Sequence, residues 1–175
     1  MKSDNISRRS FFKQALALSA VSAMPAFWIP GAKAASGAPR VSANDKVRIA
    51  FIGIGNRGAD ISQRMFKTGL CEVVALCDVD MGAPHTQKII SMFPDVPRFQ
   101  DFRQMFDKMA DKIDAVTVCT PDHSHFPITI EAMAHGKHVY VEKPMARTFQ
   151  EVELMMRAEK KFGVVTQMGN QGHSE

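Results

Sequence analysis

Cysteine is scarce in this chain: its 175 residues include only Cys71, Cys77 and Cys119. An odd number of cysteines without the close pairing of metal ligands excludes a disulfide framework and a cysteine-based zinc site. All three lie within or beside apolar segments. We therefore expect buried free thiols, which behave as small apolar side chains.

An excess of charge of one sign is also missing once the N-terminal segment 1–34 is set aside. Five of the 22 basic residues and one of the 18 acidic residues lie within that segment, so basic and acidic side chains are equal in number over residues 35–175. Without a concentrated positive face, binding to nucleic acid or to an anionic membrane is not indicated. Residues 35–175 are long enough for one domain with a proper core.

No apolar run is long enough for a typical membrane-spanning helix, because the run at residues 14–29 is short and contains Pro25. It follows the pair Arg8-Arg9 and precedes the small residues of Ala32-Lys33-Ala34. This order is typical of a twin-arginine signal peptide over residues 1–34. We expect the twin-arginine translocase as the partner in export and a periplasmic location. An ordinary secretory signal and an uncleaved anchor are the alternatives.

Past a linker at residues 35–45, strand and helix patterns alternate. Continuous apolar runs, typical of strands buried on both faces, predict strands at Val47–Ile52, Glu72–Cys77, Arg98–Phe99, Ala115–Cys119, His138–Val141 and Val164–Met168. Apolar residues at helical spacing predict helices at Arg57–Lys67, after Asp101, at Phe126–His135 and from Thr148 to Phe162. Asp101 and Thr148 are expected to cap their helices. The alternation predicts an α/β fold with a doubly wound parallel sheet.

The most informative motif is Gly53-Ile54-Gly55-Asn56-Arg57-Gly58, between the first predicted strand and the first predicted helix. Gly53 would allow a tight turn, Gly55 a close approach of a diphosphate to the backbone, and Gly58 close packing of the helix on the sheet. The N-terminus of that helix favours an anion. We therefore expect these six residues to bind a dinucleotide.

Asp78 directly follows the second predicted strand, at the distance from Gly58 where dinucleotide-binding domains carry an acidic residue. Its carboxylate is suited to accept hydrogen bonds from a ribose 2′-hydroxyl, and it would repel a 2′-phosphate. Residues 79–81 provide no arginine to offset that repulsion. The sequence therefore predicts NAD as the cofactor, with NADP less favoured.

Further candidates follow the later strands, because loops at the carboxyl edge of a parallel sheet converge. The residues expected to contact the cofactor there are Thr120, Pro121, His125, Glu142, Lys143 and Asn170. His123 and His125 are two positions apart and do not share a helix face, so we expect no metal site. Asp122 or Ser124 is a candidate helix cap.

Lys143 is the candidate catalytic residue. At the end of a buried strand we expect it to be desolvated, which lowers the pKa of a lysine, and to donate to a substrate hydroxyl or orient a general base. Pro144 rigidifies the turn, and sequence alone leaves its peptide bond cis or trans. The alternative is a surface pair of Glu142 and Lys143 at a strand end.

Several segments together resemble the glucose-fructose oxidoreductase / inositol dehydrogenase (Gfo/Idh/MocA) family. They are residues 53–58, 77–80, Thr120-Pro121 with His125, 136–144 and 167–171. The resemblance implies an NAD(P)-binding Rossmann domain at residues 46–168. It implies reversible hydride transfer between a nicotinamide and a carbinol carbon of a sugar, inositol or related polyol. Lys143 would contact the substrate hydroxyl and the nicotinamide ribose.

The resemblance also implies a second α/β domain with the substrate pocket, the oligomer contact and an acid-x-x-x-His motif whose histidine is the acid/base. We expect residues 169–175 to be the start of that domain, with the rest of it missing from this truncated chain. Cofactor binding without efficient turnover is therefore expected of residues 1–175, because orientation and proton transfer need both domains. The full-length protein is expected to be a homo-oligomer.

Three functions are consistent with these residues. The first is a periplasmic NAD(P)-dependent sugar or polyol oxidoreductase. The second is a glycosidase that uses bound NAD to oxidise and then re-reduce its sugar during elimination. The third is a non-catalytic dinucleotide-binding module.

Replacing Arg8 and Arg9 by lysine is expected to retain the precursor in the cytoplasm, because the twin-arginine route reads the arginine pair itself. Cell fractionation and immunoblotting measure the distribution, with Lys2→Arg as a control that should be exported normally. Unchanged periplasmic delivery of the double variant would refute the signal.

Overall fold

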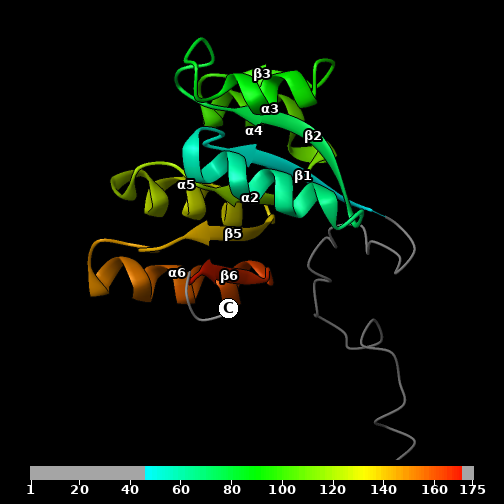
Figure 1. Cartoon of the computed structure of the whole chain (residues 1–175). Helices are drawn as coiled ribbons and strands as arrows, with labels where there is room; N and C mark the ends of the chain where they lie inside the picture. Colours follow the sequence, from blue (N-terminus) through cyan, green and yellow to red (C-terminus); the bar gives the residue numbers. More distant parts are fainter. Residues whose placement is uncertain (1–45, 171–175) are drawn as a thin grey trace, which may run out of the picture. The chain divides into compact units, whose positions relative to one another are not determined.

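The computed structural model describes residues 46–170, which form a six-stranded parallel sheet with helices on both faces (Figure 1). The strands are β1 (Val47–Ile52), β2 (Cys71–Cys77), β3 (Arg98–Phe99), β4 (Ala115–Val118), β5 (His138–Glu142) and β6 (Thr166–Gly169). Their order across the sheet is β3-β2-β1-β4-β5-β6. This confirms the predicted doubly wound α/β fold. The expected signal peptide and linker at residues 1–45, and residues 171–175, lie outside the described residues.

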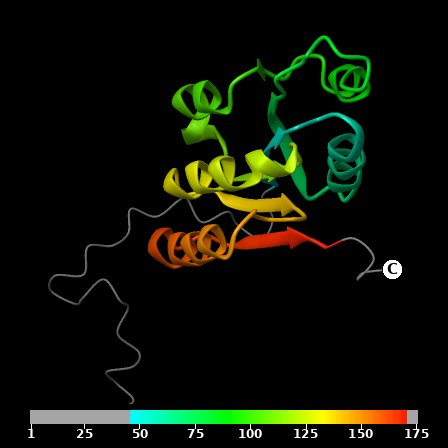
Figure 2. The same ribbon diagram turned by 90° about the vertical axis from the view of Figure 1, so that its left-hand side faces the viewer.

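The helices divide between the two faces of the sheet. They are α2 (Asn56–Lys67), α3 (Gln87–Met92), α4 (Phe102–Met109), α5 (Asp122–Ala134) and α6 (Phe149–Phe162), with a 3-10 turn η2 (Ala110–Lys112) after α4. Buried apolar side chains of α2 and α3 pack in one cluster, and those of α4, α5 and α6 in another. Figure 2 shows the two groups of helices on opposite sides of the strands. Within residues 46–170, no helix combines the length and the apolar character needed to cross a membrane.

The central strand β1 supplies side chains to both clusters. Ile49 and Phe51 belong to the cluster with α2 and α3, and Ala50 and Ile52 to the other. This alternation is what a strand buried on both faces requires, and it explains why the segment reads as one continuous apolar run.

The winding of the chain creates a crevice beside β1. The path of the chain through the sheet begins at the central strand β1, moves outward through β2 to β3, and then returns to β4 on the other side of β1. The connections that leave β1 and β4 therefore run in opposite directions. A crevice forms at the carboxyl ends of these two strands, which is where ligands bind in doubly wound sheets.

At the amino ends of the same two strands, an ion pair joins Arg48 of β1 to Asp114, the residue before β4. The Arg48 side chain donates to Asp114 through Nε (3.0 Å, to Oδ2) and through a terminal nitrogen (2.6 Å, to Oδ1), and the Arg48 amide also donates to Oδ2 (2.9 Å). Burial opposes ionisation of Asp114, but hydrogen bonds and charge from Arg48 outweigh it and lower the pKa of this carboxyl. The pair lies next to the first paired residues of the two strands that frame the crevice, Ile49 and Ala115.

Both predicted helix caps are confirmed. The Asp101 side chain accepts a hydrogen bond from the Arg103 amide at the start of α4 (2.9 Å). The Thr148 hydroxyl accepts one from the Glu151 amide at the start of α6 (3.2 Å). The Glu151 carboxylate accepts in return from the amide of Arg147, one residue before the N-cap (2.7 Å), so the contact is a variant of the capping box.

Helix α3 was not predicted, and two predicted boundaries are wrong by more than one residue. Helix α5 begins at Asp122, one turn earlier than expected, with Pro121 as its N-cap and Pro127 inside the helix rather than in its first turn. Neither Asp122 nor Ser124 provides a side-chain cap. Strand β6 begins at Thr166 rather than Val164.

Asp114→Ala is expected to lower the free energy of unfolding by about 2 kcal/mol at neutral pH, because it removes charge-assisted hydrogen bonds from Arg48. Urea denaturation measures the loss. The control is the exposed pair of Glu153 and Arg157 on α6, where Glu153→Gln should cost less than about 0.5 kcal/mol. The contribution of Asp114 is present above the pKa of an unfolded aspartate, about 4, and is lost as the pH falls through its lower folded value. The difference from wild type should therefore shrink in acid; a constant difference would contradict this account.

Candidate functional site

The glycine-rich turn after β1 is built by close backbone contacts. Gly53 has φ +78°, and a Cβ there would lie 2.5 Å from the carbonyl oxygen of Cys119. A Cβ on Gly58 would collide with the carbonyl oxygen of Gly53. The tight turn and the close helix packing expected of these two glycines are confirmed. Ile54 is fully buried behind the turn, so its side chain is not exposed to a ligand.

The N-terminus of α2 is suited to an anion. Its N-cap is Gly55, which has no side chain to cap the helix, and no acidic residue lies in its first turn. The Gly58 amide donates to the carbonyl oxygen of Gly55 (2.8 Å), and the amides of Asn56 and Arg57 and the positive end of the helix dipole are left for a ligand. A diphosphate fits these donors.

The carboxylate of Asp78 fastens the glycine-rich turn to the end of β2. Its Oδ2 accepts a hydrogen bond from the Ile54 amide (2.9 Å), and its Oδ1 accepts one from the Asp80 amide (3.0 Å). Each carboxylate oxygen has a second lone pair, so ribose hydroxyls can still donate to it. Contact of Asp78 with a ribose stays a prediction.

A cleft of about 550 Å³ lies at this edge of the sheet. The predicted residues that line it are Gly53, Gly55, Asn56, Arg57, Asp78, Thr120 and Pro121. Among the residues of its wall that the sequence did not assign to the cofactor are His85, Gln100 and His123. The sequence does indicate that His85 follows a turn near the cleft, because Gly82 to Pro84 are typical turn residues and come shortly after Asp78 at the end of β2.

A second hollow of about 240 Å³ adjoins the cleft. Arg57, Cys119 and Thr120 line both spaces. The smaller hollow adds Asp122, His125, Glu142 and Lys143. The topology thus brings the ends of β1, β4 and β5 together, as expected.

Lys143 is exposed to solvent. The prediction that its side chain is desolvated at the strand end is therefore wrong. It lies one residue past the end of β5, where its side chain leaves the sheet. The peptide bond between Lys143 and Pro144 is cis.

His125 is buried and holds two loops together. Its Nδ1 lies 2.7 Å from the carbonyl oxygen of Pro144, and its Nε2 lies 2.8 Å from that of Thr120. Because both partners are acceptors, a neutral ring donates to one of them and only a protonated ring to both. The ring is therefore engaged by backbone rather than free for a ligand. Its neighbour His123 lines the cleft, and within residues 46–170 no three His, Cys, Asp or Glu side chains gather to hold a metal ion.

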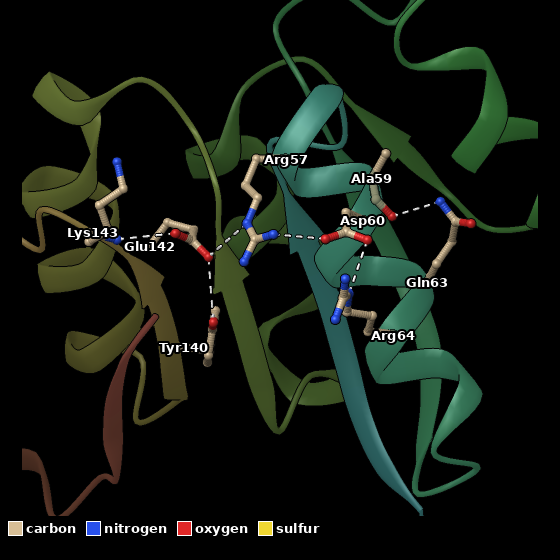
Figure 3. Close-up of polar contacts among 8 residues, drawn as sticks. All are labelled: Arg57, Ala59, Asp60, Gln63, Arg64, Tyr140, Glu142 and Lys143. Carbon is tan, nitrogen blue, oxygen red and sulfur yellow. Dashed lines mark hydrogen bonds and ion pairs between the residues drawn. The ribbon is translucent and has the colours of Figure 1, made fainter. Parts of the chain in front are cut away.

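Glu142, the last residue of β5, is buried between Arg57 in the first turn of α2 and Lys143 in the loop that follows. Figure 3 shows Arg57 reaching Glu142 on one side and Asp60 on the other. The Nε of Arg57 lies 3.5 Å from Oε1 of Glu142, and a terminal nitrogen lies 2.8 Å from Asp60. The amide of Lys143 donates to Oε2 of Glu142 (3.3 Å). One carboxylate thus connects the glycine-rich turn with the candidate catalytic lysine.

Two further residues support Glu142 and were not predicted. The Tyr140 hydroxyl donates to Oε1 of Glu142 (3.5 Å), and burial, followed by the charge of Glu142, raises the pKa of Tyr140. A Cβ on Gly169 would lie 2.5 Å from that hydroxyl, so glycine makes room for it. Asn170 follows at the same edge of the sheet but lines neither hollow.

Curated relatives match this chain over part of their length. An α-N-acetylgalactosaminidase of Bacteroides fragilis is 37% identical over 121 residues, which are 65% of this chain and 28% of that protein. A glycosyl hydrolase family 109 protein of Shewanella baltica is 35% identical over 167 residues, which cover 84% of this chain and 35% of that protein. The chain therefore spans about a third of the length of these relatives.

A solved structure shares the fold. It is the WlbA dehydrogenase of Bordetella pertussis in complex with NADH and UDP-GlcNAcA, which has a TM-score of 0.64 and 24% identity to this chain. The likeness covers 74% of this chain and 39% of that one. Residues 47–170 match the family model described as the GFO_IDH_MocA oxidoreductase family with an NAD-binding Rossmann fold. The glycine-rich turn, the acid at the end of β2 and this match lead to one conclusion: the chain belongs to the Gfo/Idh/MocA oxidoreductase family and contains its NAD-binding Rossmann domain.

Proposed function

We propose that the full-length protein transfers a hydride between NAD and a carbinol carbon of a sugar, inositol or related polyol. The observation that carries the proposal is that the two hollows lie side by side, with Arg57, Cys119 and Thr120 lining both. The larger space holds donors for a diphosphate and an acceptor for a ribose. Lys143 lines the smaller space. Bound NAD would supply the acceptor or donor of the hydride.

The larger space suits NAD better than NADP. The first-turn amides of α2 bind the diphosphate, and the carboxylate of Asp78 accepts from ribose hydroxyls while repelling a 2′-phosphate. The volume of about 550 Å³ lies within the usual range for small-molecule sites.

Lys143 is the residue that we assign to the substrate. Its exposed ammonium group donates a hydrogen bond to the substrate oxygen and favours the negative charge that develops there when the hydroxyl proton leaves. Glu142 and His125 position this lysine, since they bind the Lys143 amide and the Pro144 carbonyl. A histidine in a second α/β domain takes the proton. Export to the periplasm and a homo-oligomeric state belong to the same proposal.

A second candidate function is an NAD-dependent glycosidase, in which oxidation of the sugar is reversed after the glycosidic bond is eliminated. Its support is the 35–37% identity to an α-N-acetylgalactosaminidase and a family 109 glycosyl hydrolase. Both functions begin with the same hydride transfer, so this domain serves either one.

Net reduction of NAD separates the two functions. The full-length protein, incubated with a panel of sugars, polyols and aryl glycosides and with excess NAD or NADP, is expected to accumulate NADH from a free sugar or polyol. Absorbance of NADH and release of the aryl group are measured together. Aryl release without accumulated NADH would establish the glycosidase instead, because that route returns its hydride.

Lys143→Ala in the full-length protein is expected to lower turnover about 10²- to 10⁴-fold, as loss of a positioned proton-transfer or charge-stabilising group does. NAD affinity should change less than about threefold, because the α2 amides assigned to the diphosphate and the Asp78 carboxylate assigned to a ribose are unchanged. Steady-state kinetics and NAD titration give the two quantities. Lys160→Ala, on the exposed side of α6, is the control, and wild-type turnover of the Lys143 variant would remove the assigned role.

A further inference from the structure

The imidazole of His85 lies against the backbone of Gly55, directly before the first turn of α2. A Cβ on Gly55 would collide with Cδ2 of His85 and would lie 2.9 Å from its Nε2. The space that glycine leaves open at this position is therefore bordered by a side chain from the loop after β2. Glycine is therefore required at residue 55 by the contact with the His85 ring, as well as by the predicted approach of a diphosphate.

The backbone around His85 is held firmly. Thr86 is fully buried, and its hydroxyl donates to the carbonyl oxygen of Ala83 (2.8 Å), to which its amide also donates (3.1 Å). The Gln87 side chain donates to the carbonyl oxygen of Met81 (3.0 Å). These hydrogen bonds hold the backbone from which the His85 side chain extends.

The carboxylate of Asp78 contacts both of the loops that border the cleft beside His85. Asp78 accepts from the Ile54 amide of the glycine-rich turn and from the Asp80 amide of the loop that leads to His85. His85 accordingly lines the 550 Å³ cleft together with Gly55 and Asp78. Its ring also borders an outer hollow with Asp60 and Lys88.

The imidazole is exposed, and among residues 46–170 no side chain or backbone group forms a hydrogen bond or an ion pair with it. A histidine ring always has at least one N–H donor. Here the ring stands beside the helix end that favours an anion. We propose that His85 is a cofactor-binding residue that donates a hydrogen bond to the diphosphate of NAD. This inference rests on the binding of NAD in the cleft.

Titration calorimetry of the full chain with NAD, ADP and adenosine tests the assignment. His85→Ala is expected to weaken NAD and ADP about five- to tenfold, as loss of one hydrogen bond to a charged group does. Adenosine, which has no phosphate, should bind the variant and the wild type alike. His85→Gln keeps an N–H donor of similar reach and should bind NAD within about threefold of wild type.

Lys88→Ala is the matched control. It removes a positive charge from the outer hollow but not from the wall of the cleft, so NAD affinity should change less than about twofold. In a second measurement, the imidazole ¹⁵N resonances of His85 should shift on addition of ADP but not of adenosine. A purely structural role for His85 would not produce this difference.

Three results would overturn the proposal. Unchanged NAD affinity of His85→Ala would remove the contact, and tighter binding would show that the ring blocks the diphosphate. An equal loss for adenosine would place the contact on the nucleoside. In each case NAD binding by the wild type leaves the proposed function standing, whereas a wild type that binds neither NAD nor ADP would refute the cofactor site and this inference together.

Discussion

The contact between Gly58 and the carbonyl oxygen of Gly53 is the constraint on which the site depends. The opposing group is backbone, so a side chain at residue 58 would push α2 away from the end of β1. With glycine there, the helix packs against the turn and its N-terminus opens over the junction of β1 and β4. The same placement brings the Ile54 amide to Asp78 and the Arg57 side chain to Glu142.

The charges along the two hollows follow a simple order. Asp78 provides a carboxylate in the larger space, the amides of α2 and the guanidinium of Arg57 provide donors next to it, and Glu142 provides a second carboxylate in the smaller space. A dinucleotide has hydroxyl groups on two riboses and negative charge between them. Acceptors on either side of a group of donors are complementary to that pattern.

Most of the fold could be predicted because its strands are continuous apolar runs and its helices have clear spacing or caps. The start of α5 could not, since proline is common in a first turn and Pro127 is the more obvious marker, while Pro121 occupies the N-cap. The glycine-rich turn could be predicted from spacing alone. The contact of His85 with Gly55 could not, because it joins two loops through one side chain and leaves no periodic signal. Lys143 lies at the expected strand end. Its exposure could not be predicted, because β5 ends at Glu142 and Lys143 is the first residue outside the buried strand.

Cys119 lies where the two hollows meet, yet burial, followed by the charge of Glu142, raises the pKa of its thiol to about 12. Burial likewise raises the pKa of Cys77 to about 12, and it raises that of Cys71. The thiolate is the form that attacks electrophiles, disulfides and oxidants. Cys77 and Cys119 line the cleft, so the two thiols in its wall are held protonated at neutral pH and are poor nucleophiles.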